Sequence, residues 1–234
     1  MISRQLSFDL PVRAALGRED FFVSPANAMS VVLIESWANW AGNKLALIGP
    51  RGAGKTHLAH VWAATSGARI MPACDLEGAD IPALAQGPIA IEDVPGIARN
   101  RAAEEAMSPW VMMVIIVGHS LLLTADRPAM LWGLGLPDLS SRMQGTQAVT
   151  LDQPDDRLLA AVVMKLFADR QLSPSPETIT YLVTRMDRSF AAAHDLVAAL
   201  DRESLAQKRP VTRALAAEVM GQRELPDLLD NSGQ

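Results

Sequence analysis

The stretch Gly49-Pro50-Arg51-Gly52-Ala53-Gly54-Lys55-Thr56 fits the phosphate-binding pattern G-x-x-x-x-G-K-[ST] at every fixed position. Residues 44–48 before it have the pattern of a short buried strand, and residues 56–66 have that of a helix that ends at Gly67. A glycine-rich turn between a strand and a helix directs backbone N–H groups into a concavity, and the helix N-terminus adds partial positive charge. The stretch therefore predicts a site for a nucleoside di- or triphosphate.

The loop residues also predict the ligands in more detail. Lys55 is expected to reach the β- and γ-phosphates, and the Thr56 hydroxyl is expected to ligate Mg²⁺. The expected ligands are therefore ADP or ATP together with Mg²⁺. The residues assigned to the nucleotide here are Gly49, Pro50, Gly52, Ala53, Gly54, Lys55, Thr56 and His57.

The composition is that of a globular chain. Its 234 residues suffice for one α/β domain and a smaller one, and an apolar fraction of 49% excludes a disordered chain. The net charge of −5, with no block rich in Lys and Arg, argues against direct, sequence-specific DNA binding. The single cysteine, Cys74, excludes an internal disulfide, and residues 1–5 lack the apolar core of a signal peptide. We therefore expect a cytoplasmic protein.

One apolar segment, residues 110–117, resembles part of a membrane helix. Its eight residues are too few to span a bilayer, and Gly118-His119-Ser120 interrupts any longer count. We expect a buried helix or strand that packs beside the central sheet, with no membrane contact. A partner-binding face is the alternative.

Strands alternate with helices in the first part of the chain. A helix is expected over residues 26–40, and strands are expected over residues 44–48, 69–71, 88–91, 121–124 and 148–151. This alternation predicts a parallel, doubly wound sheet. Right-handed crossovers then place the loops that follow the strands at one edge, where ligands bind.

After Gln153-Pro154 only helices are expected, over residues 155–170, 176–186, 189–207 and 212–220. The chain is therefore divided into four parts. These are an extended N-terminal arm (residues 1–20), an α/β nucleotide-binding domain (21–153), an α-helical domain (154–220) and a polar tail that frays (221–234).

Two acidic residues, Glu92 and Asp93, follow the third expected strand. ATP hydrolysis needs an acid that holds Mg²⁺ and often one that polarises water. A solvated turn is the alternative, but in a chain with a phosphate loop the two acids join Thr56 as metal candidates. Glu92 is expected behind the direct ligands of Mg²⁺, and Asp93 nearer the water, which makes Asp93 a catalytic candidate.

Two further positions are candidates for contact with a γ-phosphate. Asp126, or less favourably Thr124, lies at the end of the fourth strand, and a capping or turn acid before Pro128 is an equal alternative. Arg142, in the run of residues 134–143, is a candidate arginine finger, which donates charge to a γ-phosphate held by a neighbouring subunit. A surface salt bridge is the alternative for Arg142.

Together these stretches resemble the AAA+ domain of the bacterial replication initiator DnaA, and more closely the Hda-type regulators related to it. The resemblance is carried by residues 22–27, 49–56, 122–128, 134–143, 185–188 and 200–202, and it covers residues 5 to about 220. It implies an α/β AAA+ P-loop NTPase with a parallel doubly wound sheet followed by a small α-helical lid domain. It also adds Asn27 to the nucleotide-binding candidates.

The resemblance implies a regulatory role with two protein partners. The N-terminal residues Gln5, Leu6, Ser7, Phe8, Asp9 and Leu10 are similar to the peptide that docks on the sliding clamp of DNA polymerase III, because Gln5 offers hydrogen bonds and three apolar side chains offer anchors. An ordinary amphipathic strand is the alternative. The second partner is the AAA+ domain of DnaA, whose bound ATP would be hydrolysed with the help of Arg142, so that reinitiation is suppressed.

One position departs from the family pattern. An arginine early in the helical domain contacts the nucleotide in the DnaA family, and alignment through residues 185–188 puts Ala191 there. Arg188, one turn earlier, is the candidate substitute. The departure argues for weak intrinsic ATPase activity at most. The residues after 220 are too few for the helix-turn-helix domain of DnaA, which also argues against DNA binding.

Two other functions stay open from the sequence. A self-sufficient motor, such as a helicase loader, would need strong turnover and a homo-oligomeric ring, which Glu92 and Asp93 permit and Ala191 opposes. A passive clamp-bound adaptor would bind nucleotide without promoting hydrolysis.

Overall fold

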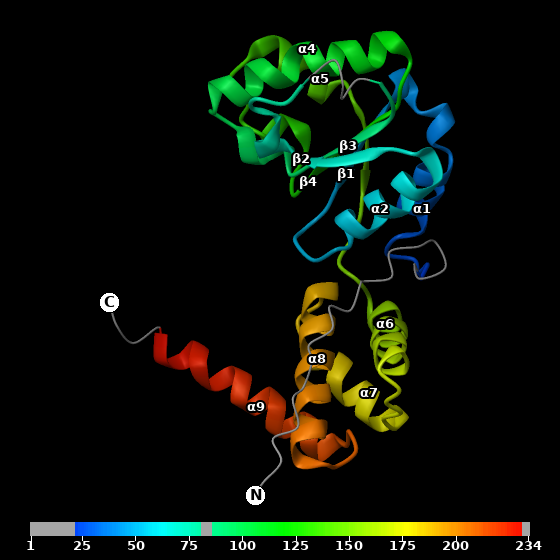
Figure 1. Ribbon diagram of the computed structural model, residues 1–234, viewed down its shortest axis with the longest axis vertical. Helices are drawn as coiled ribbons and strands as arrows, with labels where there is room; N and C mark the ends of the chain where they lie inside the picture. Colours follow the sequence, from blue (N-terminus) through cyan, green and yellow to red (C-terminus); the bar gives the residue numbers. More distant parts are fainter. Residues whose placement is uncertain (1–21, 81–85, 231–234) are drawn as a thin grey trace, which may run out of the picture.

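The computed structural model describes residues 22–80 and 86–230, which form an α/β domain followed by a helical lid domain (Figure 1). The predicted clamp-binding residues 5–10 lie outside this part of the chain. The α/β domain contains one five-stranded parallel sheet with the order β2-β3-β4-β1-β5. Its strands are β1 (Lys44–Ile48), β2 (Arg69–Pro72), β3 (Ile89–Glu92), β4 (Leu121–Ala125) and β5 (Gln147–Thr150).

The sheet is covered by helices on both faces, which is why its central strands are continuously apolar. Successive residues of a strand point to opposite faces, so Leu122 packs with one core and Leu121 and Leu123 with the other. The first core includes α1 (Ala28–Glu35) and α2 (Lys55–Ser66), and the second includes α4 (Arg101–Val117) and α5 (Pro137–Gln144) (Figure 1). The expected parallel, doubly wound sheet is confirmed.

Short 3-10 helices complete the α/β domain. They are η2 (Trp37–Asn39), η3 (Ala41–Asn43), η4 (Ala73–Leu76), η5 (Val94–Ile97) and η6 (Ala129–Leu131). The helix expected over residues 26–40 is shorter than predicted, because α1 ends at Glu35. The reason is tertiary: Trp40 is buried, its ring stacks on that of Trp62 with centroids 5.2 Å apart, and its Nε1 donates to the Leu33 carbonyl.

The apolar residues 110–117 belong to α4, a helix that packs against the sheet. Trp110 and Val111 are fully buried, as expected. Ile116 and Val117, at the end of the helix, are 74% and 57% exposed, so the expectation of burial is wrong for them. In the described part of the chain, no helix combines the length and apolarity that crossing a membrane requires.

The lid domain consists of α6 (Asp156–Asp169), α7 (Pro176–Val183), α8 (Phe190–Gln207) and α9 (Arg213–Asp230) around its own apolar core. Three of these helices begin at the polar residues that the sequence pattern favours. The side chains of Asp155, Ser175 and Ser189 accept hydrogen bonds from backbone N–H groups in the first turns of α6, α7 and α8. The last helix continues past residue 220, its predicted end, to Asp230, so most of the expected tail is helical.

Candidate nucleotide-binding site

The phosphate loop, residues 49–54, connects β1 to α2 at the edge where the parallel strands end. The Gly49 N–H donates to the Ala125 carbonyl at 3.0 Å, so β4 holds the start of the loop. Gly52 and Gly54 have φ values of 78° and 98°. Residues that carry a side chain rarely adopt this left-handed backbone conformation, so the loop requires glycine at both positions. The strand, loop and helix expected around the motif are therefore present.

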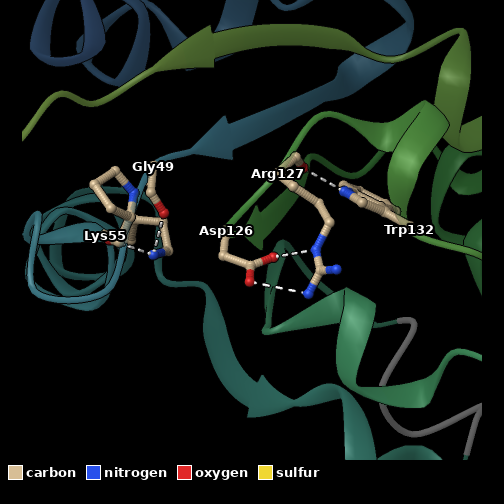
Figure 2. A network of polar contacts seen from close by, with 6 residues as sticks. Gly49, Lys55, Asp126, Arg127 and Trp132 are labelled. Atoms are coloured by element: carbon tan, nitrogen blue, oxygen red, sulfur yellow. Dashed lines mark hydrogen bonds and ion pairs between the residues drawn. The ribbon is translucent and has the colours of Figure 1, made fainter.

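Lys55 follows the loop as the first residue of α2, and its side chain reaches back to Gly49 (Figure 2). Its Nζ donates to the carbonyl oxygens of Gly49 and Pro50 at 2.7 Å and 3.0 Å, and the residue is 8% exposed. Burial lowers the pKa of Lys55, and the nearby carboxylates of Asp93 and Asp126 partly oppose this shift. An ammonium group is thus held among loop carbonyls, where it is available to a phosphate.

The predicted acids Glu92 and Asp93 end β3 beside the loop, and both act electrostatically on Lys55. Asp93 has a left-handed backbone, with φ of 53°, and its N–H donates to Thr124 Oγ1 at 3.0 Å. Thr124 is 1% exposed. Thr124 therefore positions Asp93 through the backbone, whereas the sequence offered it as an alternative contact for a phosphate.

The residues around the loop fit a hydrated Mg²⁺ ion bound together with a nucleotide. The Oε1 atom of Glu92 is buried and has no hydrogen-bond partner among the described residues, while the Thr56 side chain and Asp93 are exposed at the same edge. Among these residues there is no group of three acidic, His or Cys side chains that would hold a metal by itself. Mg²⁺ does not need such a group, because it keeps several waters and binds through one or two protein oxygens plus phosphate oxygens.

Asp126 follows β4 at the same edge, and its carboxylate is engaged by Arg127 (Figure 2). Arg127 Nε donates to Asp126 Oδ1 at 2.7 Å, and Arg127 Nη2 donates to Asp126 Oδ2 at 3.0 Å. These bonds lower the pKa of Asp126. The Trp132 Nε1 donates to the Arg127 carbonyl at 2.6 Å, so the buried indole fixes the turn. Asp126 lies close enough to Lys55 to oppose the lowering of its pKa, but the Asp126 carboxylate already pairs with Arg127.

Asn27 is buried where the chain enters α1. Its side-chain amide donates to the Phe22 carbonyl at 2.8 Å, and its side-chain oxygen accepts from the Ser24 N–H at 2.8 Å. The structure thus uses both ends of this side chain to shape residues 22–27. A direct contact of Asn27 with the nucleotide remains a prediction.

The lid domain touches the phosphate loop through the start of α8. The Phe190 N–H donates to the Gly52 carbonyl at 3.2 Å. A Cβ at Gly52 would lie 2.3 Å from the Ser189 Cβ, and a Cβ at Gly54 would lie 2.7 Å from the Phe190 ring. The glycines of the loop therefore serve the lid contact as well as the backbone turn.

Arg188, the candidate second-sensor residue, lies just before this contact and pairs with Asp156 at 2.7 Å. Both side chains are about half exposed. Ala191, where the family pattern has arginine, is exposed in the first turn of α8 and brings no charge. Within the described residues, Arg188 is thus tied to the start of the lid, and its contact with phosphate remains a prediction.

Comparison with known proteins agrees with this architecture. The family model described as "Hda, lid domain" matches residues 156–220, which are α6 to α9 up to Met220. Domain III of the replication initiation protein DnaA from Thermotoga maritima superposes with a TM-score of 0.79, at 15% identity, over 91% of this chain and 98% of that one. The chain therefore has the AAA+ fold of DnaA domain III, and its lid domain matches the Hda lid model.

Two other solved structures share the AAA+ fold. AMPPCP-bound DnaA from Aquifex aeolicus gives a TM-score of 0.66 at 16% identity, over 79% of this chain and 64% of that one. A variant of Thermotoga maritima RuvB gives a TM-score of 0.67 at 18% identity, over 86% of this chain and 70% of that one. At these identities the similarity establishes the AAA+ fold, and the role of each residue must be argued from its own geometry.

Arg142 is far from the phosphate loop of its own chain. It lies on α5, whose last turn is joined to the first residue of β1 by a bond of 2.9 Å from Lys44 Nζ to the Arg142 carbonyl. The phosphate loop follows the other end of β1, and five residues of strand span about 13 Å. The structure thus brings together Lys55, Glu92, Asp93 and Asp126 and places Arg142 at the opposite edge of the sheet.

The contacts that Ser189 and Phe190 make with the loop have no signal in the local sequence. The sequence pattern places Ser189 only at the start of an expected helix, and nothing local to Phe190 indicates that its backbone N–H would reach Gly52. The contact joins residues far apart in the chain, so only the folded arrangement of the two domains reveals it.

The first prediction concerns Lys55. Lys55→Ala should weaken ADP and ATP binding by about tenfold to a hundredfold, because a hydrogen bond to a charged group contributes about 1.5–3 kcal/mol. Isothermal calorimetry measures the affinity, with Lys165→Ala on the lid as the control. ADP should also raise the melting temperature of the wild type, by an amount that grows with ADP concentration. Unchanged affinity in Lys55→Ala would contradict the site.

The second prediction concerns the lid contact. Gly67→Ala should destabilise the protein by about 1–2 kcal/mol through left-handed strain alone, because nothing lies within 4 Å of its Cβ position. Gly52→Ala has comparable strain and adds the clash with Ser189, so it should lower the melting temperature further and weaken ADP binding. Equal melting temperatures and affinities for the two variants would show that the lid does not pack on the loop.

Proposed function

We propose that this protein promotes hydrolysis of the ATP bound to DnaA, by presenting Arg142 to the nucleotide of the partner while docked on the sliding clamp. The observation that carries the proposal is the separation of Arg142 from its own phosphate loop by the length of β1. A guanidinium at that edge is out of reach of its own nucleotide, yet it is free to meet a nucleotide on a neighbouring AAA+ domain. This is the arrangement that a finger acting in trans requires.

The surroundings of Arg142 suit such a role. Its side chain is about one third exposed and pairs with Asp138 at 2.8 Å, one turn earlier on α5. The hydrogen bond to Asp138 raises the pKa of Arg142, so the side chain is charged at any physiological pH. An exposed pair of this kind contributes little to stability, so a phosphate oxygen can replace the carboxylate when a partner docks.

The chain's own nucleotide is proposed to be mainly structural. Lys55 would exchange its contacts with Gly49 and Pro50 for phosphate oxygens, and Thr56, Glu92 and Asp93 would hold the hydrated Mg²⁺. When bound, Mg²⁺ supplies charge that neutralises the phosphates. The hydrogen bond from Phe190 to Gly52 would couple the bound nucleotide to the position of the lid domain. With Ala191 at the second-sensor position, slow intrinsic hydrolysis is expected.

The clamp tether is proposed from sequence alone, since residues 5–10 lie outside the described structure. Gln5 and the apolar Leu6, Phe8 and Leu10 have the spacing of a peptide that binds in a groove. Placement on clamp-bound DNA would bring the protein to newly replicated chromosome, where DnaA must be switched off. This role would be a cytoplasmic one.

A self-sufficient ATPase is the second candidate. The observation in its favour is that Lys55, Glu92 and Asp93 lie together at one edge of the sheet, which is the minimum for hydrolysis. In that case Arg142 would complete the site of another copy of the same chain, in a homo-oligomer. The two candidates differ in whose nucleotide is hydrolysed.

The third prediction tests the finger. Arg142→Ala should keep ADP binding and the wild-type melting temperature, since the side chain lies on the surface, but should lose stimulation of DnaA. The loss should be large, because arginine fingers accelerate hydrolysis by roughly 10³–10⁵. Lysine at this position should rescue poorly, because a point charge does not reproduce a planar fork. ATP turnover by DnaA with DNA-loaded clamp is the measurement, and Arg101→Ala on α4 is the surface-arginine control.

The motor candidate predicts the reverse pattern for the same variant. This chain alone would then hydrolyse ATP briskly, the rate per molecule would rise with concentration as copies assemble, and Arg142→Ala would abolish that activity without any DnaA present.

The fourth prediction tests the tether. Replacing Gln5 and Leu6 by Ala should abolish co-elution with the clamp, because one hydrogen-bonding end and one apolar anchor are removed. ADP affinity should not change, since the nucleotide site is built from residues 49–57 and the strand ends. Wild-type affinity of the double variant for the clamp, measured by surface plasmon resonance, would place the tether elsewhere.

A further inference from the structure

The helix that carries Arg142 is short and is held from outside at both ends. Helix α5 has eight residues, and its inner side chains Leu139 and Met143 are fully buried against the sheet. Two turns of helix are not stable alone in water, so the position of α5 depends on what contacts it. The position of Arg142, on its outer side, depends on the same contacts.

A buried carboxylate holds the N-terminal end of α5. Glu104, on α4, is 1% exposed. Its two oxygens accept hydrogen bonds from the backbone N–H groups of Gly135 and Leu136, the shortest at 2.8 Å, and from the N–H of Arg99 at 2.9 Å. Leu136 is the residue that caps α5. Burial raises the pKa of Glu104, but the backbone donors outweigh it and leave the pKa below its usual range.

An ammonium group holds the C-terminal end. Lys44 Nζ donates to the Arg142 carbonyl at 2.9 Å, and the Thr146 hydroxyl donates to the same oxygen at 3.0 Å. The last carbonyls of a helix have no partner within the helix and carry partial negative charge. Lys44 is half-buried, and burial together with the nearby Arg142 guanidinium lowers its pKa. The ammonium thus contacts the backbone of Arg142 itself.

We propose that Lys44 and Glu104 are positioning residues for Arg142, which clamp α5 at its two ends so that the guanidinium meets the phosphate of a partner in the correct place. The signs of the two groups are those that the helix dipole favours, an anion at the N-terminus and a cation at the C-terminus. They come from different elements, β1 and α4, so they tie the finger helix to the sheet and to its covering helix. This inference rests on the proposed function of Arg142.

The two contacts have a direct consequence for catalysis. A displacement of about 1 Å in a group that must meet a transition state can lower the rate by about 10²-fold. Loss of the Lys44 contact leaves Leu139 and Met143 in the core, so the protein should stay folded while the last turn of α5 loosens. Loss of the Lys44 contact should therefore lower the rate of stimulated hydrolysis without lowering the stability of the fold.

The test uses Lys44→Met, which removes the ammonium and keeps a similar side-chain volume. With DnaA and DNA-loaded clamp, the maximal rate of stimulated hydrolysis should fall by about tenfold or more, while the concentration that gives half-maximal stimulation stays the same. ADP affinity and melting temperature should stay near the wild type, and amide hydrogen exchange should speed up at residues 141–146. Lys165→Met, on the lid, is the matched control and should behave as the wild type.

Two more variants sharpen the test. Lys44→Arg, which can still donate to the Arg142 carbonyl, should recover part of the rate. Lys44→Met combined with Arg142→Ala should be no slower than Arg142→Ala alone, because a positioning residue acts only through the finger. Glu104→Gln keeps the volume of the side chain and removes its charge, and it should give the same fall in maximal rate.

The outcomes distinguish the inference from the proposed function. If Arg142→Ala loses stimulation while Lys44→Met stimulates as well as the wild type, the positioning role is overturned and the finger stands. If Lys44→Met loses rate, ADP affinity and melting temperature together, the residue is merely structural and the inference is also overturned. If Arg142→Ala stimulates normally, the proposed function has failed and the positioning role falls with it.

Discussion

The pairing of β1 with strands on both of its sides fixes the positions of the phosphate loop and of the helix that carries Arg142. β1 lies between β4 and β5 in register, and its residues Leu45 to Leu47 are almost completely buried. Its end leads into the phosphate loop, and its first residue, Lys44, contacts the helix of Arg142. One rigid strand therefore sets the distance between the place where this chain would bind its own nucleotide and the residue that would act on another. A parallel sheet keeps these two functions at opposite edges.

The lid adds a second constraint, because it meets the loop through backbone. A hydrogen bond from Phe190 to Gly52, with Ser189 against the same glycine, leaves no room for a side chain at residue 52. If phosphate binds to the loop as proposed, its binding and the packing of the lid would be linked, since both would use the same few residues. In the proposed regulator, such a link would make the bound nucleotide stabilise the packing of the lid on the loop more than supply energy through hydrolysis.

Much of this fold could be predicted from local signals. The strand at Lys44–Ile48 was bounded correctly, because a short apolar run meets Gly49, and the lid helices begin at the capping residues Asp155, Ser175 and Ser189. The acids of β3 were placed beside the loop by the rule that strand ends share an edge, and Lys55 responds to them. The features that local signals do not predict depend on contacts between residues far apart in the chain. The helix at Ala28–Glu35 is shortened by stacking of Trp40 on Trp62, and the bonds from Lys44 to Arg142 and from Glu104 to Leu136 join residues whose proximity no local pattern encodes.

Single-turnover hydrolysis tests whether Arg142 acts on the nucleotide of another protein. DnaA alone is loaded with γ-labelled ATP and mixed with DNA-loaded clamp and this protein, and the release of labelled phosphate is followed. If Arg142 acts in trans, release should be fast with the wild type and should fall to the rate of DnaA alone with Arg142→Ala. Equal release by the two proteins, or release that does not depend on either, would contradict it.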